Sequence, residues 1–253
     1  MAIWIAIVLG VIQGLTEFLP LSSSGHLLLV EHFLSVPTSM FFNLLMHLAT
    51  LVAVILFFWK DVLFCLKHPL SKQTLCLILS SFCTATIAFA MSFLPGVFEG
   101  MLLGPSFLVT AIVLLVSELW TRRKKTSFAP ISTTKAFVVG VAQGIAVLPG
   151  ISRSGSTIST LKFMGMDNQS ATSYSFLLSI PVIVGGIVLE ITTGSASNVK
   201  IGIWPCLLGF VFSFLFGLAS LFFLKKLVKN NKWWVFVPYL FVLGTLVTIW
   251  QYA

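Results

Sequence analysis

Two short polar segments stand out in a strongly apolar chain, and both carry side chains suited to work on a phosphate group. The first, EFLPLSSSGH, covers residues 17–26 and contains Glu17, three consecutive serines and His26. The second, LPGISRSGST, covers residues 148–157 and places Arg153 among glycines and hydroxyls. Carboxylate, hydroxyl, imidazole and guanidinium groups are those that nucleophilic catalysis and phosphoryl transfer use. We therefore take the two segments as candidates for one functional site.

The first segment combines a nucleophile with a base. Ser22, Ser23 and Ser24 precede His26 closely enough for one hydroxyl to reach the imidazole after a turn, which is what an activated serine requires. His26 could equally attack phosphorus itself or activate a water. The sequence leaves the attacking atom open among these three.

A divalent cation is also expected at the first segment. Gln13 and Glu17 stand four residues apart, so a helix places both side chains on one face. Oxygen ligands of this kind suit Mg²⁺ or Ca²⁺, which would bridge to a bound diphosphate. One carboxylate and one amide make a sparse shell, so the phosphate itself must complete it.

The second segment has the composition of an anion cradle. Glycines let backbone N–H groups converge, hydroxyls add donors, and the helix that follows offers its N-terminus. The guanidinium of Arg153 adds a planar fork that matches phosphate oxygens. We expect substrate contacts from this set and from two serines of the first segment: Ser22, Ser24, Gly150, Ser152, Ser154, Gly155 and Thr157. A buried ion pair between Glu17 and Arg153 that merely locks the chain is the alternative interpretation.

The composition places the whole chain in a bilayer. Of its 253 residues 58% are hydrophobic and 9% are charged, and the mean hydropathy is +1.06. Soluble domains carry about a quarter charged residues. The net charge of +8 comes from residues in short loops, so nucleic acid is not an expected partner. Six apolar windows are long enough to cross the membrane: 40–59, 73–94, 101–120, 171–190, 202–224 and 233–252.

An internal repeat sets the predicted topology. A shift of 130 residues aligns GVIQGLTEFLPLSSSG with GVAQGIAVLPGISRSG, with seven identities in sixteen positions. Each copy predicts two short helices around a Pro/Gly/Ser break, followed by three apolar windows. Irregular backbone at membrane depth needs protein or water around it, so each break is expected at the tip of a re-entrant hairpin. A hairpin plus three crossings ends on the opposite side, so the two copies must be inverted.

The fold class predicted is thus an all-α integral membrane protein built as one polytopic domain over residues 1–253. Inverted repeat 1 covers about 1–125 and inverted repeat 2 about 131–253. In this topology thirteen of the 15 basic residues share one side: Lys60, Lys67, Lys72, Arg122, Arg123, Lys124, Lys125, Lys135, Lys162, Lys225, Lys226, Lys229 and Lys232. The positive-inside rule makes that side cytoplasmic and puts both termini outside.

The motifs resemble those of a known family. QGLTEFLPLSSSGH and LPGISRSGST, together with the later SFLLSIPVIVGG, are similar to the signatures of the undecaprenyl-diphosphate phosphatases of the bacitracin-resistance (BacA/UppP) type. The resemblance spans the chain. It carries the serine and histidine of the first signature over to Ser23 and His26, and the arginine of the second to Arg153. The family's acidic signature, Glu or Gln followed four residues later by Glu, stands here in its Gln form, Gln13 with Glu17.

The resemblance implies an enzyme of the bacterial plasma (inner) membrane that hydrolyses undecaprenyl diphosphate to the monophosphate, recycling the carrier lipid for cell-wall synthesis and giving bacitracin resistance. Its catalytic residues would be Glu17, Ser23, His26 and Arg153, with Ser23 as our choice of nucleophile. A transporter or flippase of a polyprenyl phosphate lipid is the rival function, because inverted repeats with broken helices are typical of transporters. A pure transporter needs an anion clamp but no nucleophile with a base. A homodimer is one of the assembly states that the sequence allows.

Overall fold

The protein is a bundle of helices. The computed structural model describes residues 1–36, 40–94, 96, 99–123, 130–192, 201–229 and 232–253, and this part of the chain contains no β-strand. Its helices are α1 (Ile3–Phe18), α2 (Ser23–Phe33), α3 (Met40–Phe57), α4 (Trp59–Lys67), α5 (Lys72–Met91), α6 (Leu103–Arg123), α7 (Thr133–Ile145), α8 (Arg153–Phe163), α9 (Asn168–Thr192), α10 (Ile203–Lys229) and α11 (Phe236–Tyr252), with a 3₁₀ turn η1 (Trp233–Val235) before the last.

The long helices coincide with the predicted apolar windows. Five segments within the described residues are long and apolar enough to cross a membrane: 72–91, 103–121, 168–188, 203–228 and 233–252. The window at 40–59 forms α3, which meets α4 at a bend of 82° and would be the sixth span if the pair is counted as one. The prediction of an all-helical, multi-pass membrane protein is confirmed at this level.

Four shorter helices form two pairs, α1 with α2 and α7 with α8, as the repeat predicts. In each pair a serine begins the second helix, because its side chain accepts a hydrogen bond from a backbone N–H of the first turn. Ser22 accepts from Gly25 N at 3.4 Å, and Ser152 accepts from Gly155 N at 3.1 Å. The two caps are 130 positions apart, which is the offset of the sequence repeat.

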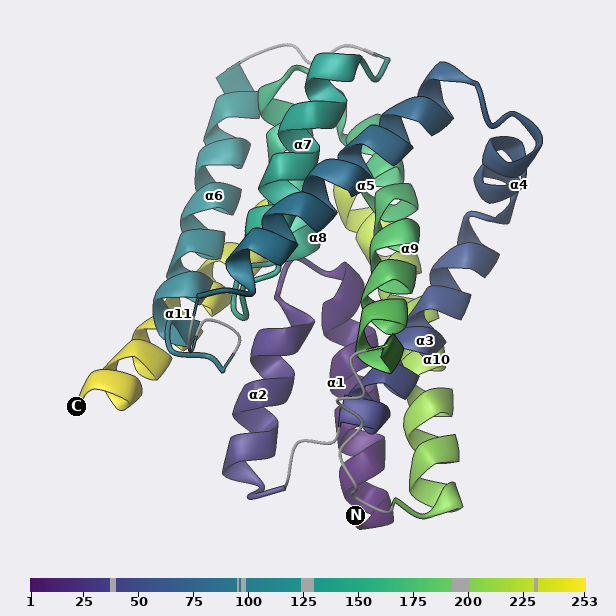
Figure 1. The fold of residues 1–253 in the computed structure, drawn as a ribbon. Coiled ribbons are helices and arrows are strands. Elements are labelled where there is room, and N and C mark those ends of the chain that lie inside the picture. Colours follow the sequence, from purple (N-terminus) through teal and green to yellow (C-terminus); the bar gives the residue numbers. More distant parts are fainter. Residues whose placement is uncertain (37–39, 95, 97–98, 124–129, 193–200, 230–231) are drawn as a thin grey trace.

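The two pairs enter the bundle from opposite ends. In Figure 1 α1 and α2 occupy the lower half, with the turn between them near mid-height, whereas α7 begins at the upper end. Each first helix packs closely along one long helix, α1 on α10 and α7 on α5. A Cβ at Gly14 would lie 2.7 Å from Gly217 N, and one at Gly144 would lie 2.5 Å from Ile87 Cβ. Gly144 stands 130 positions after Gly14, and Ile87 stands 130 positions before Gly217. The offset of the sequence repeat therefore recurs in the packing.

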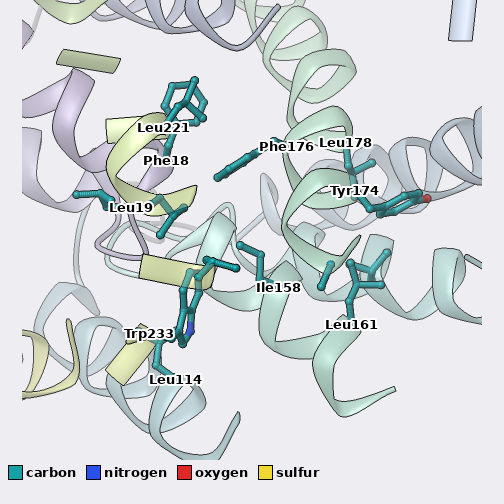
Figure 2. Close-up of a cluster of buried hydrophobic side chains, with 14 of the residues drawn as sticks. Phe18, Leu19, Leu114, Ile158, Leu161, Tyr174, Phe176, Leu178, Leu221 and Trp233 are labelled. Atoms are coloured by element: carbon teal, nitrogen blue, oxygen red, sulfur yellow. The ribbon is translucent and has the colours of Figure 1, made fainter. Parts of the chain in front are cut away.

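A buried apolar cluster lies beside the turn between α1 and α2. Figure 2 shows Phe18 of α1, Phe176 of α9 and Ile158 of α8 among its members. The rings of Phe18 and Phe176 meet edge to face with centroids 5.6 Å apart. Because Phe18 is 1% exposed, its neighbour Glu17 is fixed at the end of α1 by packing as well as by its own hydrogen bonds.

Candidate functional site

The turns of the two helix pairs are in direct contact. The backbone N–H of Gly150 donates to Ser22 Oγ at 3.0 Å, and the hydroxyl of Ser154 donates to Leu19 O at 3.1 Å. A Cβ on Gly25 would lie 2.9 Å from Gly150 N, so this close approach requires glycine. Ser22 itself has a φ of 70°, a strained conformation for a residue other than glycine that these bonds hold in place. The expectation that the two polar segments meet is confirmed.

Glu17 is the centre of the hydrogen-bond network at this junction. Its Oε2 atom accepts from Ser23 Oγ at 2.6 Å and from Gln13 Nε2 at 3.0 Å, and its Oε1 atom pairs with Arg153 Nη2. The Glu17 side chain is 3% exposed. A buried carboxylate is tolerated when it is paired with a charge and its lone pairs are satisfied, and both conditions are met here.

Arg153 is the first residue of α8, and its side chain reaches the site from there. Besides its ion pair with Glu17, its Nη1 atom donates to Ser179 O of α9 at 3.5 Å. The Arg153 side chain remains 18% exposed, whereas that of Glu17 is almost fully enclosed. Part of the Arg153 side chain is therefore accessible beyond the ion pair.

The structure gives Ser23 a different partner from the one that the sequence suggested. Its hydroxyl bonds to Glu17, while both nitrogens of His26 bond elsewhere: Nδ1 lies 2.8 Å from Ser22 O, and Nε2 lies 2.7 Å from Tyr239 OH. The turn at Leu19–Leu21 reverses the chain, so that Ser23 faces the end of α1. The spacing between the serines and His26 in the sequence does not reveal this reversal. The proton-accepting group next to the serine is thus the carboxylate of Glu17, not the imidazole of His26.

The seven predicted substrate contacts fall into two groups. Six lie at the junction of the turns, where most already serve the fold: Ser22, Ser24, Gly150, Ser152, Ser154 and Gly155. Thr157 lies one turn farther along α8, where its hydroxyl bonds to Arg153 O at 2.9 Å and contacts Ser175 of α9. Ser24 is half-buried, whereas Ser22, Ser152 and Ser154 are buried. Among the predicted site residues, Ser23, Ser24 and Arg153 have partly exposed side chains that a ligand could contact.

Two side chains that the motifs do not include, His47 and Tyr239, also belong to the network. His47 of α3 lies with Nδ1 2.9 Å from Gln13 Nε2 and 3.6 Å from Glu17 Oε2. Because an amide N–H₂ donates, Nδ1 of His47 is the acceptor in the first contact. Tyr239 of α11 is the partner of His26 described above. The sequence contains a signal for His47, because an ionisable residue inside an apolar window often has a functional role. Nothing in the sequence singled out Tyr239.

The donor set fits a divalent cation in part. Among the described residues no group of three His, Cys, Asp or Glu side chains is arranged to hold a metal. Gln13 Oε1, however, is buried and has no hydrogen-bond partner in the part of the chain that the structure describes. The contact of this side chain with Glu17 is made by Nε2, so a turn of the amide would bring two oxygen ligands together, and a bound phosphate would supply the rest.

A cavity of about 490 Å³ lies apart from this network. It is lined by residues of α2 and α11 and of the turn before α6, among them Glu31, His32, Glu99 and Trp250. Glu17, Ser23 and Arg153 do not line it. This cavity is therefore separate from the candidate site.

Comparison with known proteins agrees with the motifs. Residues 6–246 match the family described as bacitracin resistance protein BacA. Over its full length the chain is 39% identical to the undecaprenyl-diphosphatase of Treponema denticola and 38% identical to that of Christiangramia forsetii, each covered completely. It is 35% identical to the undecaprenyl-diphosphatase of Carboxydothermus hydrogenoformans, with 98% of this chain and 97% of the relative covered. With this coverage and identity, the chain belongs to the BacA family.

Proposed function

We propose that this protein is a membrane phosphatase that hydrolyses undecaprenyl diphosphate to undecaprenyl phosphate and inorganic phosphate. The observation that carries the proposal is the network in which Glu17 joins the hydroxyl of Ser23 to the guanidinium of Arg153. It unites a nucleophile, a base and an anion-binding group in one place. The relatives named undecaprenyl-diphosphatase supply the substrate.

In the proposed reaction Ser23 Oγ attacks the terminal phosphorus and transfers its proton to Glu17 Oε2. The Oγ–P bond forms, the bond from phosphorus to the bridging oxygen breaks, and undecaprenyl phosphate leaves with that oxygen. A water then attacks the phosphoserine and gives one proton to His26 Nε2. The Oγ–P bond breaks, Ser23 Oγ takes back the proton held by Glu17, and phosphate leaves. Arg153 stabilises the charge on the transferring oxygens, a contribution that for such arginines amounts to about 10³ to 10⁵ in rate.

Ser23 is favoured over His26 as the attacking group by their partners. The hydroxyl of Ser23 bonds to a carboxylate that can take its proton. His26 Nε2 instead lies 2.7 Å from a phenol, and Nδ1 is taken by a carbonyl. A role of His26 in the water step fits this placement better than direct attack.

We further propose that a divalent cation, Mg²⁺ or Ca²⁺, binds together with the diphosphate. Gln13 Oε1 and Glu17 would hold it, and it would neutralise charge on the phosphate oxygens. Gln13 Oε1 supports this site, because it has no hydrogen-bond partner among the residues that the structure describes. The single carboxylate requires that substrate supply most of the remaining ligands.

The architecture that we propose consists of two inverted repeats, about 1–125 and 131–253, each a re-entrant hairpin followed by three spans. Support comes from the contacts at an offset of 130 residues and from the opposite ends at which α1 and α7 begin (Figure 1). In such a fold two turns meet at midplane depth, where broken helices commonly bind ligands.

The proposed location is the bacterial plasma membrane, with both termini outside and the basic loops in the cytoplasm. Figure 1 places α4 and the start of α7 at the end opposite the N-terminus, which supports this orientation because Lys60, Lys67 and Lys135 lie there. Recycling of the carrier lipid would serve cell-wall synthesis. It would also confer bacitracin resistance, since the antibiotic sequesters the diphosphate form.

The decisive experiment is phosphate release from a long prenyl diphosphate by the purified protein in detergent with and without Mg²⁺. We expect release by the wild type that depends on the cation, and near-complete loss in Arg153→Ala and His26→Ala. Wild-type protein that binds the lipid but releases no phosphate would instead favour a flippase. The network of Ser23 with Glu17 argues for the enzyme, because transport requires no nucleophile.

A further inference from the structure

Tyr239 holds the imidazole of His26 from a helix that neither motif contains. The phenolic oxygen lies 2.7 Å from His26 Nε2, and the two rings stack with centroids 5.8 Å apart and planes inclined by 14°. On another side of the imidazole, Phe107 of α6 meets it edge to face at 5.2 Å. His26 is thus clamped between rings from α6 and α11, two helices that pack along each other.

The hydrogen bonds fix which nitrogen of His26 carries the proton. Nδ1 faces Ser22 O at 2.8 Å, and a carbonyl oxygen can only accept, so Nδ1 bears hydrogen. In the neutral ring Nε2 is then the acceptor, and the hydroxyl of Tyr239 donates to it. A hydroxyl can also accept, so the same phenol remains a partner after Nε2 gains a proton. Tyr239 can therefore stay bonded to His26 in both protonation states.

We propose that Tyr239 is a positioning residue for the phosphatase reaction, acting through His26. The Ser22 carbonyl sets the tautomer whose Nε2 lone pair can take a proton, and Tyr239 aims that lone pair through its hydrogen bond and its stacked ring. Tyr239 is 47% exposed, so its ring has room to yield Nε2 to a water when phosphoserine must be hydrolysed. This inference rests on the proposed function and extends it to a residue 213 positions from His26.

The kinetic test removes the hydroxyl and keeps the ring. In Tyr239→Phe we expect kcat to fall about tenfold, the equivalent of one good hydrogen bond, with KM changed less than about twofold. Tyr252→Phe is the matched control, because Tyr252 lies on the same helix and its hydroxyl donates to Met101 O, away from the site. An unchanged kcat in Tyr239→Phe, or an increase in KM alone, would overturn the proposal.

A spectroscopic test reports on the pair without turnover. In protein labelled with nitrogen-15 histidine, we expect Tyr239→Phe to shift the signals of His26 and to leave those of His32, His47 and His68 in place. The His26 signals are assigned by their loss in His26→Gln. An active enzyme whose His26 signals do not respond to Tyr239→Phe would contradict the pairing. A wild type that releases no phosphate would overturn the proposed function, and with it the role in turnover, even where the signals shift.

Discussion

The hydroxyl of Ser23 lies 2.6 Å from Glu17 Oε2, and the guanidinium of Arg153 pairs with Oε1 of the same carboxylate. The nucleophile, its base and the charge that would hold the phosphate therefore share a single buried group. Changes to Glu17 should affect both proton transfer and the placement of Arg153, and this coupling shapes the first two predictions.

Replacing Glu17 by Gln should lower kcat for phosphate release by about 10² or more, since general-base catalysis contributes on that scale. The amide preserves size and can still hydrogen-bond, so folding should persist, as a melting temperature in detergent would show. Glu99→Gln, at an exposed carboxylate, is the control and should keep full activity. A Glu17→Gln enzyme as fast as the wild type would exclude the carboxylate as base.

Arg153→Lys should keep the charge but lose the planar fork that pairs with Glu17 and with phosphate oxygens. We expect kcat/KM to fall about tenfold in the lysine variant and by about 10³ in Arg153→Ala. Lys60→Ala, on the exposed helix α4, controls for the general loss of a positive charge. Equal activity of Arg153→Lys and wild type would show that charge alone is needed.

Gln13→Glu tests the proposed cation site. A second carboxylate next to Glu17 adds a charged oxygen ligand, and affinity for Mg²⁺ rises with the number of such ligands. We expect the Mg²⁺ concentration that gives half-maximal phosphate release to decrease. If the variant and the wild type show the same dependence on Mg²⁺, the cation does not bind at these residues.

Gly14→Ala should destabilise the contact between α1 and α10. A Cβ there would lie 2.6 Å from Ser213 O, and overpacking of this kind costs about 1 to 3 kcal/mol. Thermal unfolding in detergent should show a lower melting temperature. Gly185→Ala is the matched control, because a Cβ at Gly185 meets no atom within 4 Å. Comparable melting temperatures for both variants would argue against close packing at Gly14.

The orientation can be checked by labelling single cysteines in a variant without the four native ones. With an impermeant reagent added outside intact cells, we expect Ala253→Cys to react and Lys67→Cys to stay unlabelled. Both positions are exposed in the structure, so burial does not explain a difference. The reverse pattern would place the basic loops outside.

Much of the helical framework could be predicted from the sequence, because apolar windows and breaks reflect local chemistry. The six windows became helices, and the caps at Ser22 and Ser152 follow from hydroxyls before a helix. The bend of 82° between α3 and α4 was not anticipated, since the apolar window ends at residue 59 and the charged residues after it predict a loop. Length and hydropathy do not report a change of helix direction.

The local geometry of the site was predictable in the same way. Gln13 and Glu17 share a helix face because the spacing of four residues dictates it, and the hydrogen bond between them is present. The meeting of the two polar segments followed from the internal repeat. Both inferences depend on periodicities that one chain displays without reference to its packing.

The sequence by itself thus determined which residues are polar in an apolar chain, and where the helices must break around them. Only the tertiary structure decided that Ser23 bonds to Glu17 instead of His26, and that His47 and Tyr239 complete the network. The reason is physical: hydrogen bonds between helices depend on how the turns fold back and how the helices are rotated. Those variables are set by packing across the whole bundle.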